Sequence, residues 1–409
     1  MTRIALAAAE QLADAVDAWG MPGLRALLPV AGMSVVEHQA EQARAIGCDT
    51  FLLLIDALPA PLTEAVDRIR ARGLPVQLVR NASDVMTACA GASELWLIAD
   101  GLVAAPRLWR AAGLGEAPLL LTVEDGPVTA TLERIDAQTR WAGLARLTPA
   151  QWADLANAPA DWDAQLYLLR GAVQAGVEQY ACEPAMFVGG DATLADSLED
   201  AADAQEKLLT TSSRVETGLV GRFVLAPMLA LAAPALLARQ SSGNIARLVS
   251  HLGAFGAMAG ALTGHIAVAA GAGLAAAIGH QAADFIGRFR PASAVQRAFG
   301  WLGLLLQFLA LGIAERGMMV AAGQWHWGSG SNAMSLFLAL TLLLQRRITP
   351  RLAQWGPDFA LAWLVSAFAV TAFGWRTGFD MAAALLGLLL LLPVAWSAWR
   401  GDGLASHAV

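Results

Sequence analysis

The second half of the chain, residues 219–399, is a series of apolar runs separated by short loops that carry arginine. Runs such as 299–313 and 359–373 follow one another, and few soluble folds could bury so many of them. The whole chain is 56% hydrophobic with a mean hydropathy of +0.51, which is typical of integral membrane proteins. We therefore expect this half to lie in a lipid bilayer.

The two halves carry opposite charge. Residues 1–218 hold 15 basic and 29 acidic side chains, a net charge of −14, whereas residues 219–409 hold 12 basic and 5 acidic ones, a net charge of +7. Neither pattern suits a nucleic-acid partner, because the first half is acidic and the basic charge of the second half is spread over loops. The three cysteines are widely spaced in the first half, which indicates a reducing cytoplasm rather than a disulfide framework.

The first half alternates short apolar runs with segments of helical periodicity, such as 35–46 and 62–72. This alternation predicts a Rossmann-like α/β domain, a parallel sheet with helices on both faces. Asp100 directly follows the fourth run, and ligands of such sheets bind at the carboxyl ends of strands. An ordinary turn aspartate is the alternative. The predicted strands are 4–8, 51–55, 76–79, 95–99 and 119–123.

The second half predicts an all-α domain with six membrane spans after a juxtamembrane helix at 219–238, which two prolines and an arginine interrupt. With six spans, the loop arginines other than Arg376 fall on one side of the membrane together with the first half. Arginine-rich loops are cytoplasmic, so we expect a multi-pass protein of the inner membrane with a cytoplasmic N-terminal domain. Glycine and alanine fill the first two spans and predict close helix packing. The predicted spans are 248–263, 266–284, 298–320, 333–345, 359–374 and 380–399.

Three segments of the first half resemble sugar-phosphate nucleotidyltransferases. Residues 20–38 read GMPGLRALLPVAGMSVVEH, Asp100 and its neighbours read Ala-Asp-Gly, and residues 191–196 read DATLAD. The resemblance implies a nucleotide or phosphosugar ligand and a magnesium ion held by Asp100 and Asp191. It also implies that Arg25 takes the place of the family's lysine as a cofactor-binding residue.

The same resemblance departs from the family after the first strand. The glycine-rich loop whose amides cradle phosphate should fall near residues 8–15, which here read AAEQLADA without a glycine. Glu10 would repel a phosphate. We therefore expect weak nucleotide binding and no efficient transfer.

The order of the two halves resembles a second family. Residues 214–222 read RVETGLVGR and residues 242–244 read SGN, similar to the entry of CDP-alcohol phosphatidyltransferases. The match is to fused enzymes that join an inositol-phosphate cytidylyltransferase to a di-inositol-phosphate phosphate synthase. It implies a nucleotidyltransferase-like domain at 1–210, a CDP-alcohol phosphatidyltransferase-like domain at 211–409, membrane lipids as partners and a homodimer through the spans.

Four aspartates on two spans of that family bind the metals of the transfer reaction. Placing residues 287–288 on the family's Ala-Arg pair puts His280 and Ala283 at the first two aspartates and Asp284 at the family's glycine. Because the acidic cluster is missing, the resemblance does not imply the family's transferase activity.

His280, Asp284 and Arg288 recur one helical turn apart near the end of an apolar run, and we take them as candidate catalytic residues. Solvated polar residues at a helix end are the alternative interpretation. Arg288, Arg290 and Arg297 also suit a phosphate-bearing headgroup and are candidate ligand-binding residues.

Three hypotheses about function follow. The first is a catalytically degenerate membrane protein that acts as a binding or scaffold partner in inositol phospholipid or sphingolipid synthesis. The second is an active nucleotidyltransferase or lipid phosphotransferase with an altered site. The third is a lipid-handling or transport protein on the same fold. The lost glycine loop and lost aspartates favour the first hypothesis over the second.

Overall fold

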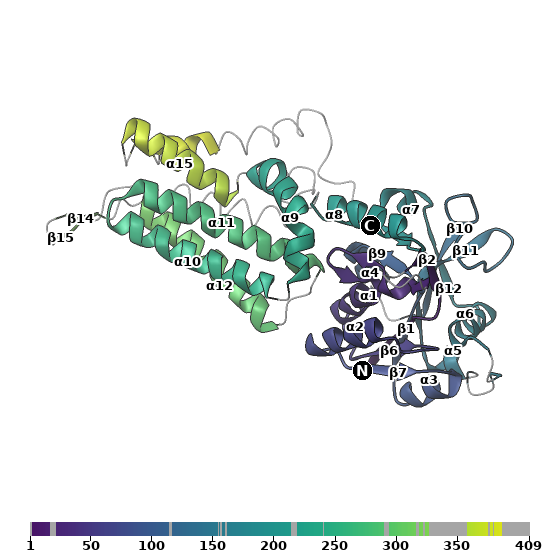
Figure 1. The fold of residues 1–409 in the computed structure, drawn as a ribbon. Helices are drawn as coiled ribbons and strands as arrows, with labels where there is room; N and C mark the ends of the chain where they lie inside the picture. The colour runs from purple at the N-terminus through teal and green to yellow at the C-terminus, as the bar shows by residue number, and fades with distance from the viewer. Residues whose placement is uncertain are drawn as a thin grey trace. The chain divides into compact units, whose positions relative to one another are not determined.

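The computed structural model (Figure 1) divides into two compact units, residues 1–211 with 288–291, and residues 212–287 with 292–409. It describes residues 2–16, 22–113, 117–153, 155, 158–159, 162–213, 219–239, 241–289, 294–315, 319–321, 324–326, 358–374, 377–378 and 380–386.

The first unit is an α/β domain around a seven-stranded sheet with the order β12-β10-β11-β8-β1-β6-β7. All five predicted strands are present, and β1 lies between β6 and β8 and pairs in parallel with both. Most of the strands are apolar and buried, as expected where helices cover both faces of a sheet, but the edge strand β12 is exposed at four of its five residues. Their bounds are β1 Arg3–Ala8, β6 Thr50–Leu54, β7 Val76–Val79, β8 Glu94–Ile98, β10 Leu119–Glu124, β11 Thr139–Leu147 and β12 Glu178–Cys182.

The predicted parallel sheet is confirmed in part: most strand pairs are parallel, but β11 runs antiparallel to both β8 and β10. Arg140 and Arg146 interrupt the apolar pattern of β11, so the sequence did not indicate a strand there. Arg146 is nevertheless buried: its Nε donates to the carbonyl of Ala117 at 2.9 Å, and its guanidinium lies 5.7 Å from the Trp96 ring centroid. Arg146 is therefore a buried, hydrogen-bonded charge at a position where the sequence alone suggests exposure to solvent.

Helices cover the sheet in two layers (Figure 1). α1 (Val35–Ala45), α2 (Ala60–Ala71) and α4 (Pro106–Ala112) pack together on one face, and α5 (Pro149–Trp152) and α6 (Ala164–Gln174) lie on the other. Short paired strands and further helices complete the unit: β2 Leu12–Val16 with β3 Pro22–Leu24, β4 Pro29–Val30 with β5 Met33–Ser34, β9 Leu102–Ala104 with β13 Ala192–Leu194, α3 Ala82–Ala88, α7 Ala185–Gly189 and α8 Leu198–Ser213.

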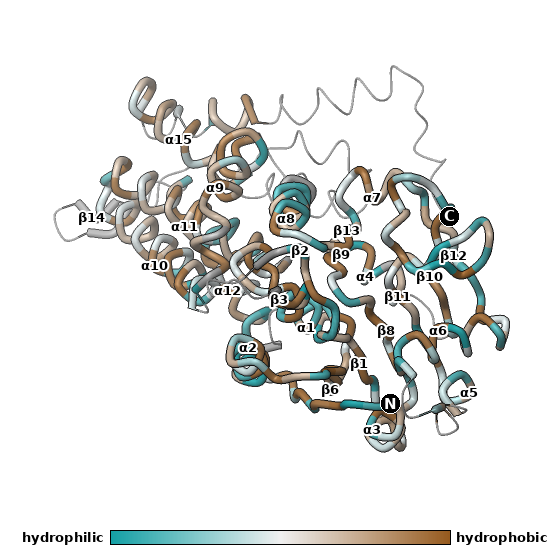
Figure 2. Tube along the Cα trace, turned by 45° about the vertical axis from the view of Figure 1, so that its right-hand side comes forward, coloured by the Kyte–Doolittle hydropathy of each residue, from teal (hydrophilic) through white to brown (hydrophobic). Residues whose placement is uncertain are grey.

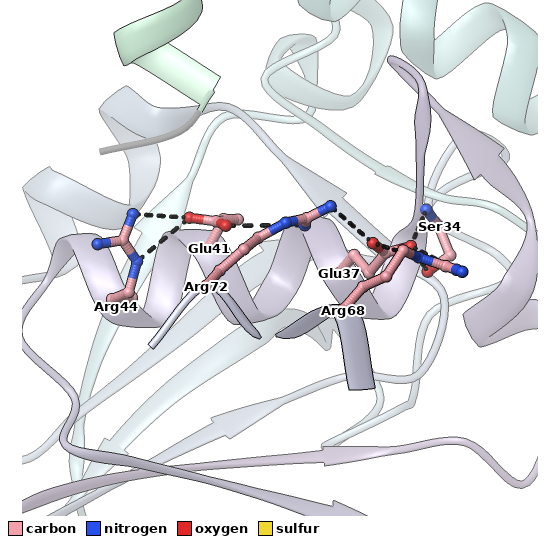
Figure 3. A network of polar contacts seen from close by, with 6 residues as sticks. All are labelled: Ser34, Glu37, Glu41, Arg44, Arg68 and Arg72. Atoms are coloured by element: carbon pink, nitrogen blue, oxygen red, sulfur yellow. Dashed lines mark hydrogen bonds and ion pairs between the residues drawn. The ribbon is translucent and has the colours of Figure 1, made fainter. Parts of the chain in front are cut away.

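A buried charge network fastens α1 to α2 (Figure 3). Glu37 caps the start of its own helix through Ser34, whose N and Oγ donate to Oε2 at 3.0 and 2.8 Å. Arg68 and Arg72 pair with the same carboxylate at 3.0 and 2.9 Å. Burial alone would raise the pKa of Glu37, but hydrogen bonds from Arg68 and Ser34 and the charge of Arg72 lower it. Nε and Nη1 of Arg72 have no hydrogen-bond partner among the described residues, although Nη1 lies 3.7 Å from Oε1 of Glu41. The contacts of Arg68 and Arg72 join α1 to α2, and we interpret the network as structural.

Among the described residues of the second unit, three helices are long and apolar enough to cross a membrane, over Ser242–Leu262, Ile266–Gly287 and Val295–Glu315. They belong to α10 (Ser242–Leu262), α11 (Ile266–Phe289) and α12 (Ala294–Glu315). In Figure 2, much of the trace along these helices has the brown colours of hydrophobic residues. The contacts of α10 place it parallel to α12 and antiparallel to α11.

Glycines allow α10 and α11 to touch backbone to backbone, which confirms the predicted close packing. A Cβ on Gly253 would lie 2.6 Å from the backbone N of Ala276, and one on Gly260 would lie 2.5 Å from that of Ala269. Both distances are shorter than any ordinary carbon contact. Only glycine fits at these two positions.

The other predicted membrane segments are only partly described. The predicted third span is too long at its end, because α12 ends at Glu315 and a strand, β14 (Met319–Ala321), pairs with β15 (Gln324–His326). The predicted span 359–374 forms a shorter helix, α15 (Phe359–Phe373). The juxtamembrane segment forms the π-helical turn Gly221–Leu225 and α9 (Ala226–Ala238). The predicted span 333–345 and most of 380–399 lie outside the described residues.

Candidate functional site

The strand order of the first unit creates a switch point beside β1. From β1 the chain proceeds outward to β6 and β7, and then returns to β8 on the other side of β1. Connections that leave neighbouring parallel strands in opposite directions open a crevice at their carboxyl ends, where ligands of such sheets bind. The segments that follow β1 and β8 here are residues 9–11 and 99–101.

The side chain of Asp100 contacts the loop that follows β1 at this switch point. The residue is 4% exposed, and its Oδ2 accepts hydrogen bonds from the backbone N–H of Glu10 at 3.1 Å and of Gln11 at 2.9 Å. Burial raises the pKa of Asp100 to about 6, although these amides and the charge of Arg25 act in the opposite direction. Its Oδ1 is buried and has no hydrogen-bond partner among the described residues. The loop amides therefore bind a carboxylate of the protein itself.

Arg25 is engaged in a second internal pair. Its Nε lies 3.0 Å from Oδ1 of Asp196, and its Nη1 donates to the side-chain oxygen of Gln11. The backbone N of Arg25 also donates to the carbonyl of Gln11 at 3.0 Å. Burial raises the pKa of Asp196, against the effect of the Arg25 charge. The cation predicted to meet a phosphate is thus held against a carboxylate.

Gly101 brings these groups together. Its φ of +77° is a conformation that side chains disfavour, and a Cβ there would lie 2.8 Å from the carbonyl oxygen of Ala195. The backbone N of Ala195 donates to the carbonyl of Gly101 at 2.9 Å. This contact sets Asp196 beside the turn that carries Asp100. The Ala-Asp-Gly motif of the sequence therefore has a geometric reason for its glycine.

Glu10 makes the crevice acidic. The side chain is about half buried, and burial, followed by the charges of Asp163, Asp56 and Asp100, raises its pKa to about 7. Near neutral pH a large fraction of this carboxyl group is protonated. Glu10 and the three acidic side chains that act on it disfavour an approaching phosphate unless a cation comes with it.

The structure does not bring Asp100 and Asp191 side by side. They lie at opposite ends of the ribbon formed by β9 and β13, whose three residue pairs span about 10 Å at ~3.4 Å per residue. Asp191 forms an ion pair with Arg107. Among the described residues, no group of three His, Cys, Asp or Glu side chains is placed to hold a metal ion. Asp196, not Asp191, is the acidic neighbour of the closed loop.

Sequence reasoning missed the partners of Asp100. The signal for Asp196 was present, because it belongs to the same family-like turn as Asp191. Gln11 gave no signal, since its role depends on a backbone N–H and on a contact 89 residues away.

The candidates in the second unit form a polar group at one end of the long helices. His280 and Asp284 lie one turn apart on α11, with Nε2 and Oδ2 3.7 Å apart, and Asp284 is 61% exposed. On α10, Arg247 donates to Asn244 at 2.9 Å, and Gln296 of α12 donates to the same amide at 3.2 Å. Polar side chains at a helix end agree with simple solvation by water as well as with a catalytic role.

The predicted headgroup arginines are described in part. Arg297 is exposed on α12. The side chain of Arg288 and the whole of Arg290 lie outside the described residues.

Comparison with known proteins gives similarities at the level of structure. No family model matches the chain, and no curated protein matches it. Solved structures similar to about half of the chain include a UDP-glucose pyrophosphorylase complexed with UDP-glucose, with 12% identity and a TM-score of 0.36 over 52% of this chain and 100% of the other.

Two further structures are similar over 51% of this chain. One is the inositol-1-phosphate CTP transferase from T. maritima, with 16% identity and a TM-score of 0.39 over 96% of that chain. The other is a nucleotidyl transferase from Methanothermobacter, with 16% identity and a TM-score of 0.35 over 99% of that chain. At these identities and TM-scores, what the chain does has to be argued from its own residues.

Proposed function

We propose that this chain is a membrane-anchored, nucleotidyltransferase-like protein whose nucleotide crevice is closed by its own side chains. In this proposal it acts as a binding or scaffold partner in inositol phospholipid or sphingolipid synthesis. The observation that carries the proposal is the contact of Asp100 with the amides of Glu10 and Gln11. The lipid context rests on the resemblance of the sequence to fused cytidylyltransferase and phosphatidyltransferase enzymes.

Nucleotide binding at this crevice would have to break contacts before making new ones. A phosphate needs backbone N–H groups and a cation, but both amides are bonded to Asp100 and Arg25 is paired with Asp196. Hydrogen bonds to charged groups contribute ~1.5 to 3 kcal/mol each. Losing two of them would weaken a micromolar site about 10²-fold or more, to the millimolar range.

A working nucleotidyltransferase that opens when magnesium binds is the second candidate. The buried Oδ1 of Asp100, which has no partner among the described residues, favours it, because an incoming cation would satisfy that atom. In this case Arg25 would exchange Asp196 for a nucleotide phosphate, and Asp191 would have to leave Arg107 to join the metal.

A ligand titration separates the two candidates. The full-length protein in detergent is titrated with CTP and magnesium while its thermal unfolding midpoint is recorded, beside Asp100→Asn and the control Asp67→Asn on α2, whose side chain is 68% exposed. We expect no rise in the midpoint of the wild type below millimolar CTP. A rise at micromolar CTP that Asp100→Asn abolishes and Asp67→Asn retains would refute the closed crevice and favour the second candidate.

A further inference from the structure

A small group of polar side chains lies between α10 and α12, inside the membrane-length part of both helices. Ser250 is 2% exposed and Gln307 is 1% exposed, and Nε2 of Gln307 lies 3.4 Å from Oγ of Ser250. Polar groups between membrane helices cost free energy unless they are paired, and they often mark sites of function. The contact between Ser250 and Gln307 by itself would be an ordinary hydrogen bond between two membrane helices.

His251 adds a buried acceptor that no group among the described residues uses. Its Nδ1 lies 2.5 Å from the carbonyl oxygen of Arg247. A carbonyl oxygen only accepts, so Nδ1 carries the proton and Nε2 of the neutral ring is an acceptor. Nε2 is buried and has no hydrogen-bond partner among the described residues. The ring is held in place edge to face on Phe299, with centroids 6.3 Å apart.

These groups converge at Gly303. A Cβ on this glycine would lie 3.4 Å from Cε1 of His251, 3.5 Å from its Nε2 and 3.4 Å from Oγ of Ser250. Gln307 follows one turn later on α12 and reaches the same hydroxyl, and its Oε1 is also buried without a partner among the described residues. One point between the helices, at Gly303, is therefore flanked by an imidazole nitrogen and a hydroxyl, and the carboxamide of Gln307 contacts that hydroxyl.

The surroundings of this point are apolar and outward-facing. Phe299, which packs on His251, is 53% exposed, and Leu248 and Leu252 on α10 are 57% and 62% exposed. In a bilayer such side chains contact lipid tails. A ligand would thus reach His251 from the lipid and not from water.

We propose that His251, Ser250 and Gln307 bind the free hydroxyl group of an uncharged membrane lipid. The hydroxyl donates its hydrogen to Nε2 of His251. Turning the carboxamide of Gln307 over exchanges its oxygen and nitrogen, so that it donates to the lipid hydroxyl and accepts from Ser250. Every polar atom at the point then has a partner. This site is separate from the nucleotide crevice and does not depend on the function proposed for it.

Charged ligands fit the same point less well. The orphaned atoms are acceptors, which repel an anion such as a phosphate. A cation would find no carboxylate among the described groups that line the point, and it would have Arg247 one turn away on α10. A hydroxyl, which both donates and accepts, matches the three side chains without adding charge.

Photo-crosslinking of the full-length protein in lipid nanodiscs tests the proposal. The probe is a diacylglycerol with a diazirine in one acyl chain, and the comparison lipid is the same molecule with its hydroxyl acetylated. One hydrogen bond changes affinity up to about tenfold. We expect the free hydroxyl to label the wild type about fivefold more than the acetylated lipid does, and His251→Phe and Gln307→Leu each to remove the difference.

Matched variants separate loss of the acceptor from loss of the fold. His265→Phe changes an exposed histidine at the other end of α10 and should keep the difference. His251→Gln supplies an acceptor oxygen in place of Nε2 and should therefore show the labelling difference between the two lipids that His251→Phe loses. Gly303→Ala places its Cβ at an ordinary contact distance and should be tolerated, whereas Gly303→Leu fills the point and should abolish labelling. Equal labelling of the wild type by both lipids, or labelling unchanged in a folded His251→Phe protein, would overturn the proposal.

Discussion

Asp100 shows what a sequence reveals about a single residue and what it leaves out. Its position could be predicted, because it follows a buried strand at the edge of a sheet where ligands bind. Its partners could not, because the amides of Glu10 and Gln11 lie about 90 residues away and any residue supplies an N–H. The same limit applies to His251, whose importance depends on which ring nitrogen the Arg247 carbonyl occupies.

The Glu10 carboxyl group should make stability depend on pH. Its pKa is about 7 in the folded protein against an ordinary value of 4.5, so the folded state holds the proton longer than the unfolded state does. Stability should therefore fall as pH rises from 4.5 to 7 and stay lower above 7. Glu10→Gln removes this penalty, and we expect it to raise the thermal unfolding midpoint at pH 8 and to leave it nearly unchanged at pH 4.

Glu64→Gln is the control for this measurement, since the side chain of Glu64 is 74% exposed. Asp100 also has a raised pKa and contributes in the same direction, so some pH dependence should remain in Glu10→Gln. An equal change in midpoint at pH 4 and pH 8 would contradict the assignment to ionisation of Glu10.

Among the elements, those with unbroken apolar patterns were predictable. The predicted strand 76–79 matches β7 residue for residue, and β1, β6, β8 and β10 match within one residue at each end. β11 was missed because Arg140 and Arg146 break its pattern, although tertiary contacts satisfy both charges. The three long helices were predicted by their apolar runs, but their starts were placed up to six residues late where polar residues begin the helix.

The contact between α10 and α11 makes a prediction at this scale. Gly253→Ala and Gly260→Ala each force a methyl group against the backbone of α11, and overpacking of this kind costs ~1 to 3 kcal/mol. We expect both variants to lower the thermal unfolding midpoint of the protein in detergent, measured by circular dichroism. Gly271→Ala, where nothing lies within 4 Å of the new Cβ, should leave the midpoint unchanged or raise it, because alanine favours a helix. Equal effects at positions 253 and 271 would show that this close contact does not form.

For the whole molecule, charge and hydropathy could be read from the sequence, but the number of spans could not be settled. In the part of the chain that the structure describes, three helices have the length and composition of spans, whereas α15 is 15 residues long. Apolar runs interrupted by proline and glycine give no clear ends in sequence, and only a packed structure assigns them. The separation into two units has a simple physical basis, because an acidic α/β domain and an apolar helical bundle require different solvents.

The antiparallel order of α10 and α11 predicts the membrane sides of their connections. Residue 263, after α10, and residue 298, near the start of α12, should face opposite compartments, with 298 on the cytoplasmic side of the arginine-rich loops. The test uses Thr263→Cys and Ala298→Cys, both at exposed positions, in a protein whose three buried cysteines are replaced by serine.

A membrane-impermeant maleimide applied to intact cells should label position 263 and not position 298. Permeabilised cells should allow labelling of both, which confirms that each cysteine is reactive. Labelling of position 298 in intact cells would reverse the orientation, and labelling of both positions would show that α11 does not cross the membrane.

The hydrogen bonds between Asp100 and the loop amides also determine what could regulate ligand binding at the crevice. A group tethered within the same fold competes at an effective concentration set by geometry, on the order of millimolar even for a flexible link. This concentration does not change when the cell gains or loses nucleotide. A ligand far below this concentration therefore leaves the crevice to Asp100, and occupancy at such levels rises only with a partner that draws the Asp100 carboxylate away.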